Sequence, residues 1–116
     1  MRRFVVIGLG TFGATVARRL HALGQEVVAI DRRAEAVDAI GASVVRAVVG
    51  DASNRAVLEE AGATQADVAI ISTGEDLAAS ILAVLAVRDS GIKEIHVKVR
   101  SEEHARITDA LGAAGS

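Results

Sequence analysis

The sequence contains no cysteine, proline, tryptophan or tyrosine, and its only aromatic residues are Phe4 and Phe12. The lack of cysteine excludes disulfides, thiolate catalysis and cysteine metal sites, and it fits a reducing cytoplasm. With two aromatics and no concentrated basic stripe, the chain lacks the stacking and electrostatic features of nucleic-acid-binding proteins. We therefore expect no nucleic-acid partner.

Long hydrophobic runs are also missing. The longest, residues 77–87, is interrupted by Ser80 and is far shorter than the roughly 20 residues needed to cross a bilayer. The apolar run after Met1 is too short for the core of a signal peptide. We expect no direct membrane insertion, so any membrane role would come through a partner.

The 116 residues are 51% hydrophobic and 24% charged, which predicts one globular domain without room for a second, substrate-binding domain. Apolar runs at 4–7, 27–30, 44–49, 68–71 and 95–99 predict strands, and helical segments separate them. The first four runs are nearly continuous, as in buried parallel strands, whereas the last alternates, as in a strand near an edge. The pattern predicts an α/β fold, a Rossmann-type doubly wound parallel sheet with helices on both faces.

Glycines mark the predicted helix ends, where a left-handed conformation is favourable. They are Gly24, Gly41, Gly62, Gly91 and Gly112. Only four residues follow the last of them, so we expect the next strand to be missing. On this view residues 1–116 form a single, C-terminally truncated domain whose downstream lobe is absent.

A glycine motif, G-x-G-x-x-G, follows the first predicted strand directly and opens a helix from Thr11 to Leu23. Gly8 permits the tight turn, Gly10 lets the backbone approach a pyrophosphate, and Gly13 allows close packing of helix on strand. The amide groups and positive dipole end of the helix would then face the phosphates. We expect an apolar stripe to dock this helix on the sheet, formed by Phe12, Val16, Leu20 and Leu23.

An acidic residue, Asp31, ends the second predicted strand eighteen residues after Gly13. A carboxylate there accepts hydrogen bonds from ribose hydroxyls; the alternative is a structural turn beside a solvated acid. Arg32 and Arg33 raise the possibility of a ribose 2′-phosphate, which Asp31 would repel. This favours NAD or an adenine nucleotide over NADP.

The loop after the third predicted strand, residues 50–53, is expected at the same edge of the sheet. Its small residues, Ala52 among them, would border the adenine. Asp51 or Ser53 would either bind the nucleotide or cap the next helix.

Two later loops also leave strand ends at that edge. Thr73 and Gly74 are expected near the nucleotide, and Thr73 to Asp76 fits the start of a helix. Lys98 would either stabilise phosphate at a distance or remain a solvated lysine.

The three histidines, His21, His96 and His104, are not spaced for metal binding, and we assign them structural roles. No tyrosine–lysine pair or nucleophile elbow is present either. We therefore expect no catalytic residue, no metal site and no enzymatic activity.

The helix of residues 77–87 is apolar nearly all round. Packing on one sheet face needs one apolar stripe, so a second face would be left to cover. We expect self-association through this helix.

Together, the segments 6–13, 28–31, 49–53, 66–71 and 96–100 resemble the TrkA-N domain, the nucleotide-binding lobe of proteins that regulate conductance of potassium (RCK domains). The phenylalanine within the glycine motif and the Gly-Asp-Ala-Ser loop at 50–53 make the resemblance more specific than a generic Rossmann match. It extends over essentially the whole chain.

The resemblance implies a cytoplasmic subunit that forms dimers and then a ring beneath a membrane potassium channel or transporter, and that switches with NAD(H), ATP or ADP. Members that discriminate ATP often carry arginine at the position of Thr11, so its absence leaves NAD or ADP open. The family's usual acid and strand beyond the last helix are expected to be missing. The residues expected to line the site are Gly8, Gly10, Thr11, Phe12, Gly13, Asp31, Asp51, Ala52, Thr73, Gly74 and Lys98, with Arg32 beside them.

Two alternatives stay open from the sequence. The chain could be the cofactor-binding half of an NAD-dependent dehydrogenase, which would require a proton donor further along. It could also be a nucleotide-free structural domain.

Overall fold

The computed structural model describes residues 1–115, in which strands and helices alternate. They are β1 (Arg3–Ile7), α1 (Thr11–Ala22), β2 (Glu26–Asp31), α2 (Ala34–Ile40), β3 (Arg46–Val49), α3 (Arg55–Glu60), β4 (Val68–Ile71), α4 (Leu77–Asp89), β5 (Glu94–Val97), α5 (Glu102–Ala110) and β6 (Ala114–Gly115), with short 3-10 turns η1 (Gly41–Ser43) and η2 (Ala63–Gln65).

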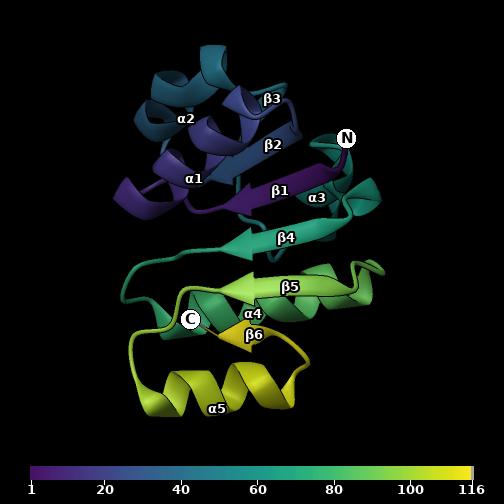
Figure 1. The fold of residues 1–116 in the computed structure, drawn as a ribbon. Coiled ribbons are helices and arrows are strands. Elements are labelled where there is room, and N and C mark those ends of the chain that lie inside the picture. Colours follow the sequence, from purple (N-terminus) through teal and green to yellow (C-terminus); the bar gives the residue numbers. More distant parts are fainter. Residues whose placement is uncertain (116) are drawn as a thin grey trace.

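The six strands form one parallel sheet in the order β3-β2-β1-β4-β5-β6. The chain builds outward from β1 to β3 and then returns to the other side of β1 for β4. Figure 1 shows the arrowheads of β1, β2, β4, β5 and β6 pointing to the same edge of the sheet. The predicted Rossmann-type doubly wound sheet is confirmed, and its strand order reverses beside β1, the place where such sheets bind ligands.

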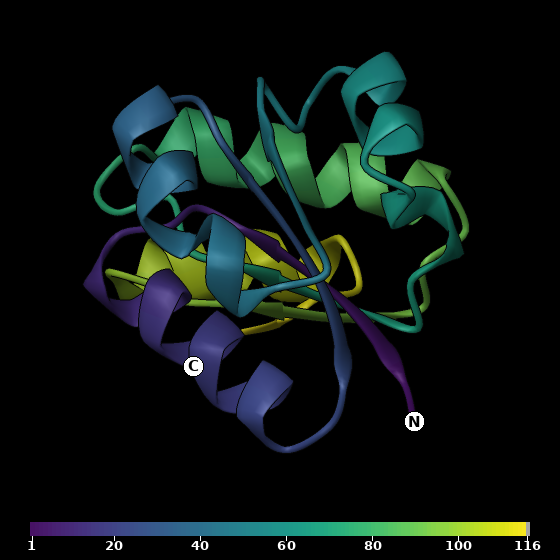
Figure 2. The same ribbon diagram turned by 90° about the horizontal axis from the view of Figure 1, so that it is seen from above.

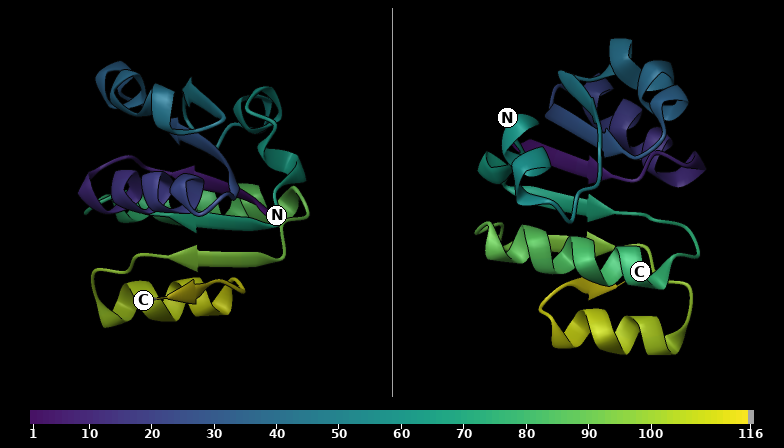
Figure 3. Two further views of the ribbon diagram at one scale, coloured as in Figure 1. Left: turned by 45° about the horizontal axis from the view of Figure 1, so that its top comes forward. Right: turned by 180° about the vertical axis from the view of Figure 1, so that it is seen from behind.

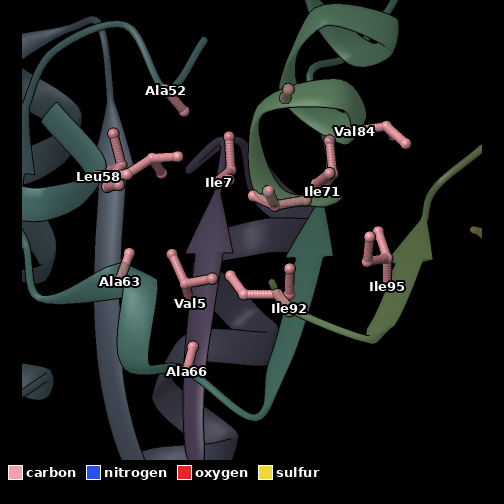
Figure 4. Packing of buried hydrophobic residues seen from close by; sticks show 14 of the residues in the cluster. Val5, Ile7, Ala52, Leu58, Ala63, Ala66, Ile71, Val84, Ile92 and Ile95 are labelled. Carbon is pink, nitrogen blue, oxygen red and sulfur yellow. The ribbon is translucent and has the colours of Figure 1, made fainter. Parts of the chain in front are cut away.

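Helices cover both faces of the sheet (Figures 2 and 3). On one face α1 and α2 pack in a cluster that includes Val27 and Ile40. On the other, α3 and α4 contribute Leu58 and Val84, which lie to either side of Ile7 of β1 in Figure 4. Hydrophobic clusters therefore pack on both faces of β1, the strand that leads into the glycine motif.

The two edges of the sheet are β3 and β6, and β5 lies next to β6. Within the run 44–49, Val45 and Val49 are 60% and 49% exposed, because β2 alone pairs with β3. β5 lies between β4 and β6, and its alternation arises because Ile95 and Val97 face the core while His96 is exposed. The expectation of a strand near an edge is confirmed, since only the short strand β6 lies beyond β5 on that side of the sheet.

A sixth strand follows the last helix, so the prediction that this strand is missing was wrong. Ala114 pairs with His96 and Gly115 with Val97, in parallel with β5. Small residues suit this position, since a Cβ at Gly115 would lie 2.9 Å from Cγ1 of Val99. An Ala-Ala-Gly segment has no β-branched or aromatic residue to signal a strand.

Four of the five glycines predicted to end helices have the left-handed conformation, namely Gly24, Gly62, Gly91 and Gly112. Gly41 does not. Its φ is −50° because the chain continues from α2 directly into the turn η1.

The face of α1 that docks on the sheet is formed mostly by small residues, and of the predicted stripe Leu20 packs against the core. Gly13 and Ala17 are buried, whereas Phe12 and Leu23 are 41% and 60% exposed. A Cβ at Gly13 would lie 1.8 Å from the carbonyl oxygen of Gly8. This close approach leaves no room for any side chain at position 13, and the neighbouring Phe12 lies on the outer side of the helix.

α4 buries one face against the sheet and leaves apolar side chains on another. Ala83, Val84 and Val87 are buried, but Leu77 and Leu82 are 40% and 48% exposed. The second apolar face expected from the sequence is therefore present on the chain.

Candidate functional site

A cavity of about 840 Å³ opens at the carboxyl edge of the sheet, around the end of β1. All the residues predicted to form the nucleotide site line it, except Gly13. They are Gly8, Gly10, Thr11, Phe12, Asp31, Arg32, Asp51, Ala52, Thr73, Gly74 and Lys98. The topology thus brings together residues that are scattered over more than ninety positions in the sequence.

Backbone hydrogen bonds fix the loops around the cavity. The N–H of Gly8 donates to the carbonyl of Ile30 (2.9 Å), and the N–H of Ser72 donates to that of Ile7 (2.8 Å). The N–H of Lys98 donates to the carbonyl of Ile71 (2.9 Å) in the same way. The parallel ladder therefore extends one residue past each strand, which holds the first loop residues in place.

The three glycines of the motif have different surroundings. Gly8 has φ of +93°, and a Cβ there would lie 1.8 Å from the carbonyl oxygen of Ser72. Gly13 contacts Gly8 itself and lies behind the cavity wall. Gly10 has no heavy atom within 4 Å of a Cβ position, so its bare backbone faces open space. Gly8 and Gly13 are therefore required by the fold, whereas Gly10 leaves room for a ligand.

The amino end of α1 carries no side-chain cap at Gly10. The first N–H groups of a helix have no partner within the helix, so those of Thr11 and its neighbours are left to bind other groups. Together with the positive end of the helix dipole, they form a site suited to phosphate oxygens.

Asp31 ends β2 and is tied to the glycine loop. Its Oδ2 accepts the N–H of Leu9 (2.7 Å), and its Oδ1 accepts the N–H of Arg33 (2.8 Å) and that residue's Nε–H (3.3 Å). Burial would raise the pKa of Asp31, but these hydrogen bonds and the Arg33 charge together hold it below its ordinary value. The carboxylate is therefore charged at neutral pH.

The loop after β3 is organised by Asp51, which does not cap the following helix. Its Oδ1 accepts the N–H (2.9 Å) and hydroxyl (2.8 Å) of Ser53, which hold the pKa of Asp51 below its ordinary value, with a further contribution from Arg32 at 3.3 Å. The cap of α3 is Asn54, which accepts the N–H of Ala56. Neither Asp51 nor Ser53 is thus needed as a helix cap.

The predicted helix start from Thr73 to Asp76 is also different. Asp76 is the cap of α4 and accepts the N–H of Ala79 (2.9 Å), while the Thr73 hydroxyl donates to the carbonyl of Asp76 (3.0 Å). Gly74 has φ of +67°. Asp76, and not Thr73, caps the helix because the chain turns at Gly74 before the helix begins.

Two cations lie at the end of the cavity formed by the loop after β5. The Lys98 ammonium is 5.1 Å from the centre of the Phe12 ring, within the range of a cation–π contact. The Nε–H of Arg100 donates to the carbonyl of Gly74 (3.3 Å). Arg100 was not among the predicted site residues, although its place three residues after a strand end was the available signal.

Other residues of the cavity wall were also missed by the sequence analysis. Arg33 was considered only for a 2′-phosphate, and Ser72 only as part of a loop. Thr15 and Val16 were assigned no ligand role, but both line the cavity from α1. A helical position facing a cavity has no sequence signature of its own.

His104 has a structural role, as predicted. It is buried, its Nδ1 accepts the N–H of Arg100 (3.1 Å), and its Nε2 lies 2.8 Å from the hydroxyl of Ser80. Because Nδ1 is an acceptor, Nε2 is the ring nitrogen left to donate to the Ser80 hydroxyl. The histidine thus ties α5, α4 and the loop after β5 together.

Within residues 1–115, no three potential metal-binding side chains come together. Over the same residues, no helix has the length and apolar character needed to span a membrane.

A family model described as the TrkA-N domain matches residues 4–115. Two proteins of Bacillus subtilis are similar over 112 residues, or 97% of this chain: Ktr system potassium uptake protein C is 34% identical and Ktr system potassium uptake protein A is 32% identical. The chain spans about half the length of these curated relatives, 51% and 50% respectively.

Solved structures have the same fold. The TrkA-N domain of the inner membrane protein ybaL from Escherichia coli gives a TM-score of 0.86 at 22% identity, over 98% of this chain and 84% of that one. The RCK domain of GsuK gives 0.79 at 29% identity, over 98% and 24% of the two chains. The GsuK channel bound to NAD gives 0.81 at 17% identity, over 98% and 21%.

Proposed function

The chain belongs to the TrkA-N domain family, and on that basis we propose that it is the nucleotide-sensing domain of a component that regulates potassium uptake. Its ligand is NAD(H) or an adenine nucleotide, ADP or ATP. Its partner is a potassium channel or transporter in the membrane, which the domain meets at the cytoplasmic face. The relatives are named as potassium uptake proteins, which favours this interpretation over the cofactor half of a dehydrogenase.

One observation carries the proposal: the bare backbone at Gly10, the uncapped end of α1 and the Asp31 carboxylate all face one cavity. The first two suit phosphate oxygens and the third suits ribose hydroxyls. The GsuK channel has this fold and binds NAD. We propose a sensing role without catalysis, in which the ligand shifts the arrangement of paired domains.

Replacing Asp31 with alanine is expected to weaken binding of the best nucleotide by about 1 to 3 kcal/mol, the usual scale for hydrogen bonds to a charged group. Calorimetric titrations of NAD, NADH, ATP, ADP and AMP against the wild type and Asp31→Ala provide the measurement. Asp38→Ala is the control, because it removes the same charge from an exposed position on α2. Equal affinity of the wild type and Asp31→Ala, or no binding by the wild type, would contradict the proposal.

The exposed apolar face of α4 is proposed to join subunits into a homodimer or a larger ring. Leu82→Glu is expected to shift the protein towards the monomer in analytical ultracentrifugation, because a charge buried in an apolar interface is costly. Asp38→Ala, an exposed change on α2 at the opposite face of the sheet, should leave the association unchanged. A wild type that sediments as a monomer at all concentrations would end this part of the proposal.

A further inference from the structure

The Asp31 carboxylate, which we assign to ribose binding, already accepts hydrogen bonds from the protein at both oxygens. Oδ1 of Asp31 accepts two hydrogen bonds, from the N–H and the Nε–H of Arg33, and Oδ2 accepts one, from the N–H of Leu9. Each carboxylate oxygen has about two acceptor positions. One position on Oδ2 is therefore free, and Oδ1 is saturated while the guanidinium of Arg33 stays in place.

The number of free acceptor positions on Asp31 distinguishes nucleotides by the number of hydroxyls on their sugar. A single hydroxyl can be accepted by the free position on Oδ2. Two neighbouring hydroxyls, as on a ribose, would use both oxygens of Asp31, and the second hydroxyl can reach Oδ1 only if the Nε–H of Arg33 leaves. The backbone N–H of Arg33 cannot leave, since it is fixed at the start of α2.

The Arg33 side chain has room to move. It is 56% exposed, whereas the Asp31 side chain is only 10% exposed, so the arginine covers the acid from outside. Arg33 also lines a second cavity, of about 350 Å³, between α1 and α2. Glu35 and Arg18 line this cavity as well, and the carboxylate of Glu35 offers the displaced guanidinium another partner.

We propose that Arg33 is a specificity-determining residue, whose guanidinium competes with the ribose 2′,3′-diol for Oδ1 of Asp31. Nucleotides with an intact diol displace it into the second cavity, and nucleotides with one sugar hydroxyl leave it in place. Ribose recognition is thereby coupled to a movement of the Arg33 side chain. This inference rests on the proposed nucleotide site.

The test compares ADP with 2′-deoxy-ADP, which differ in one sugar hydroxyl, by calorimetric titration. Arg33→Met removes the competitor and keeps the backbone N–H. It is expected to raise the preference for ADP over 2′-deoxy-ADP by about three- to fivefold, the scale of a partly exposed ion pair. The affinity for 2′-deoxy-ADP itself should stay within about twofold of the wild type, because that ligand never displaces the arginine.

Arg18→Met is the matched control, since it removes the same charge from the same second cavity without touching Asp31. It should leave the preference at the wild-type value. The preference is a ratio measured on one sample, so a small loss of folded protein cancels. If Arg33→Met leaves the ratio unchanged or lowers it while the wild type binds ADP, the inference is overturned and the nucleotide site stands. If the wild type binds neither ligand, both are overturned.

Discussion

Gly8→Ala is expected to destabilise the domain by about 3 kcal/mol or more, the combined scale of an unfavourable backbone conformation and an overpacked contact. Gly8 has φ of +93°, and an added Cβ would lie 1.8 Å from the carbonyl oxygen of Ser72 and 2.7 Å from its carbon. Neither Gly8 nor Ser72 can shift easily to relieve this contact. Gly8 is bonded to Ile30 and Ser72 to Ile7, both by ladder hydrogen bonds at 2.9 and 2.8 Å.

Equilibrium unfolding in urea measures the loss, and Gly24→Ala separates its two causes. Gly24 has a similar φ of +87°, but no heavy atom lies within 4 Å of its Cβ position. That substitution carries the conformational cost alone, about 1 kcal/mol. If the two variants lose equal stability, the contact between the β1 and β4 loops does not contribute, and the close approach we describe is wrong.

The sequence predicted the parts of this fold that depend on local pattern. The turn at Gly8, the helix that follows it and the acid at the end of β2 are all encoded within about thirty consecutive residues. Each has a physical requirement that few residue types meet. The alternation of strands and helices then places the later loops at the same edge, so the cavity wall was largely predictable.

Features that depend on contacts between distant segments were not predictable in the same way. The exposure of β3 and the interior position of β5 follow from strand order, which no single run of residues encodes. β6 forms because β5 offers an open ladder to two small residues. Gly13 contacts Gly8, and the neighbouring Phe12 lies on the outer side of the helix. The periodicity of apolar residues in the helix gives no sign of this contact.

Side-chain partners at the site were hidden for a related reason. Asp31 was predicted as a free acceptor, but the chain turns after β2 so that Arg33 folds back on it, two residues away. The same turn chemistry makes Asp51 bind Ser53 and leaves the cap of α3 to Asn54. Several residues in each loop are able to cap or bind, and the backbone conformation decides between them.

Gly10→Ala is expected to lower the nucleotide affinity by at least about tenfold, equivalent to about 1.4 kcal/mol. Unlike Gly8→Ala, it should cause no loss of stability. The backbone of Gly10 has φ of −69° and ψ of −168°, which alanine adopts without strain. Apart from its two chain neighbours, no heavy atom of the described residues lies within 4 Å of the added methyl group. The methyl group would therefore occupy only the space in which a pyrophosphate approaches the backbone.

Urea unfolding and calorimetric titration with NAD and ADP, on the same preparation, measure the two quantities. Gly41→Ala is the control: it also has an ordinary φ, −50°, and open space around its Cβ position, but it lies in η1 and does not line the cavity. It should leave the nucleotide affinity unchanged and should not lower the stability. A Gly10→Ala protein that binds as tightly as the wild type would mean that the phosphates do not contact this turn. The open space at Gly10 would then be a gap in the surface, and the distinction between the glycines of the motif would be one of packing alone.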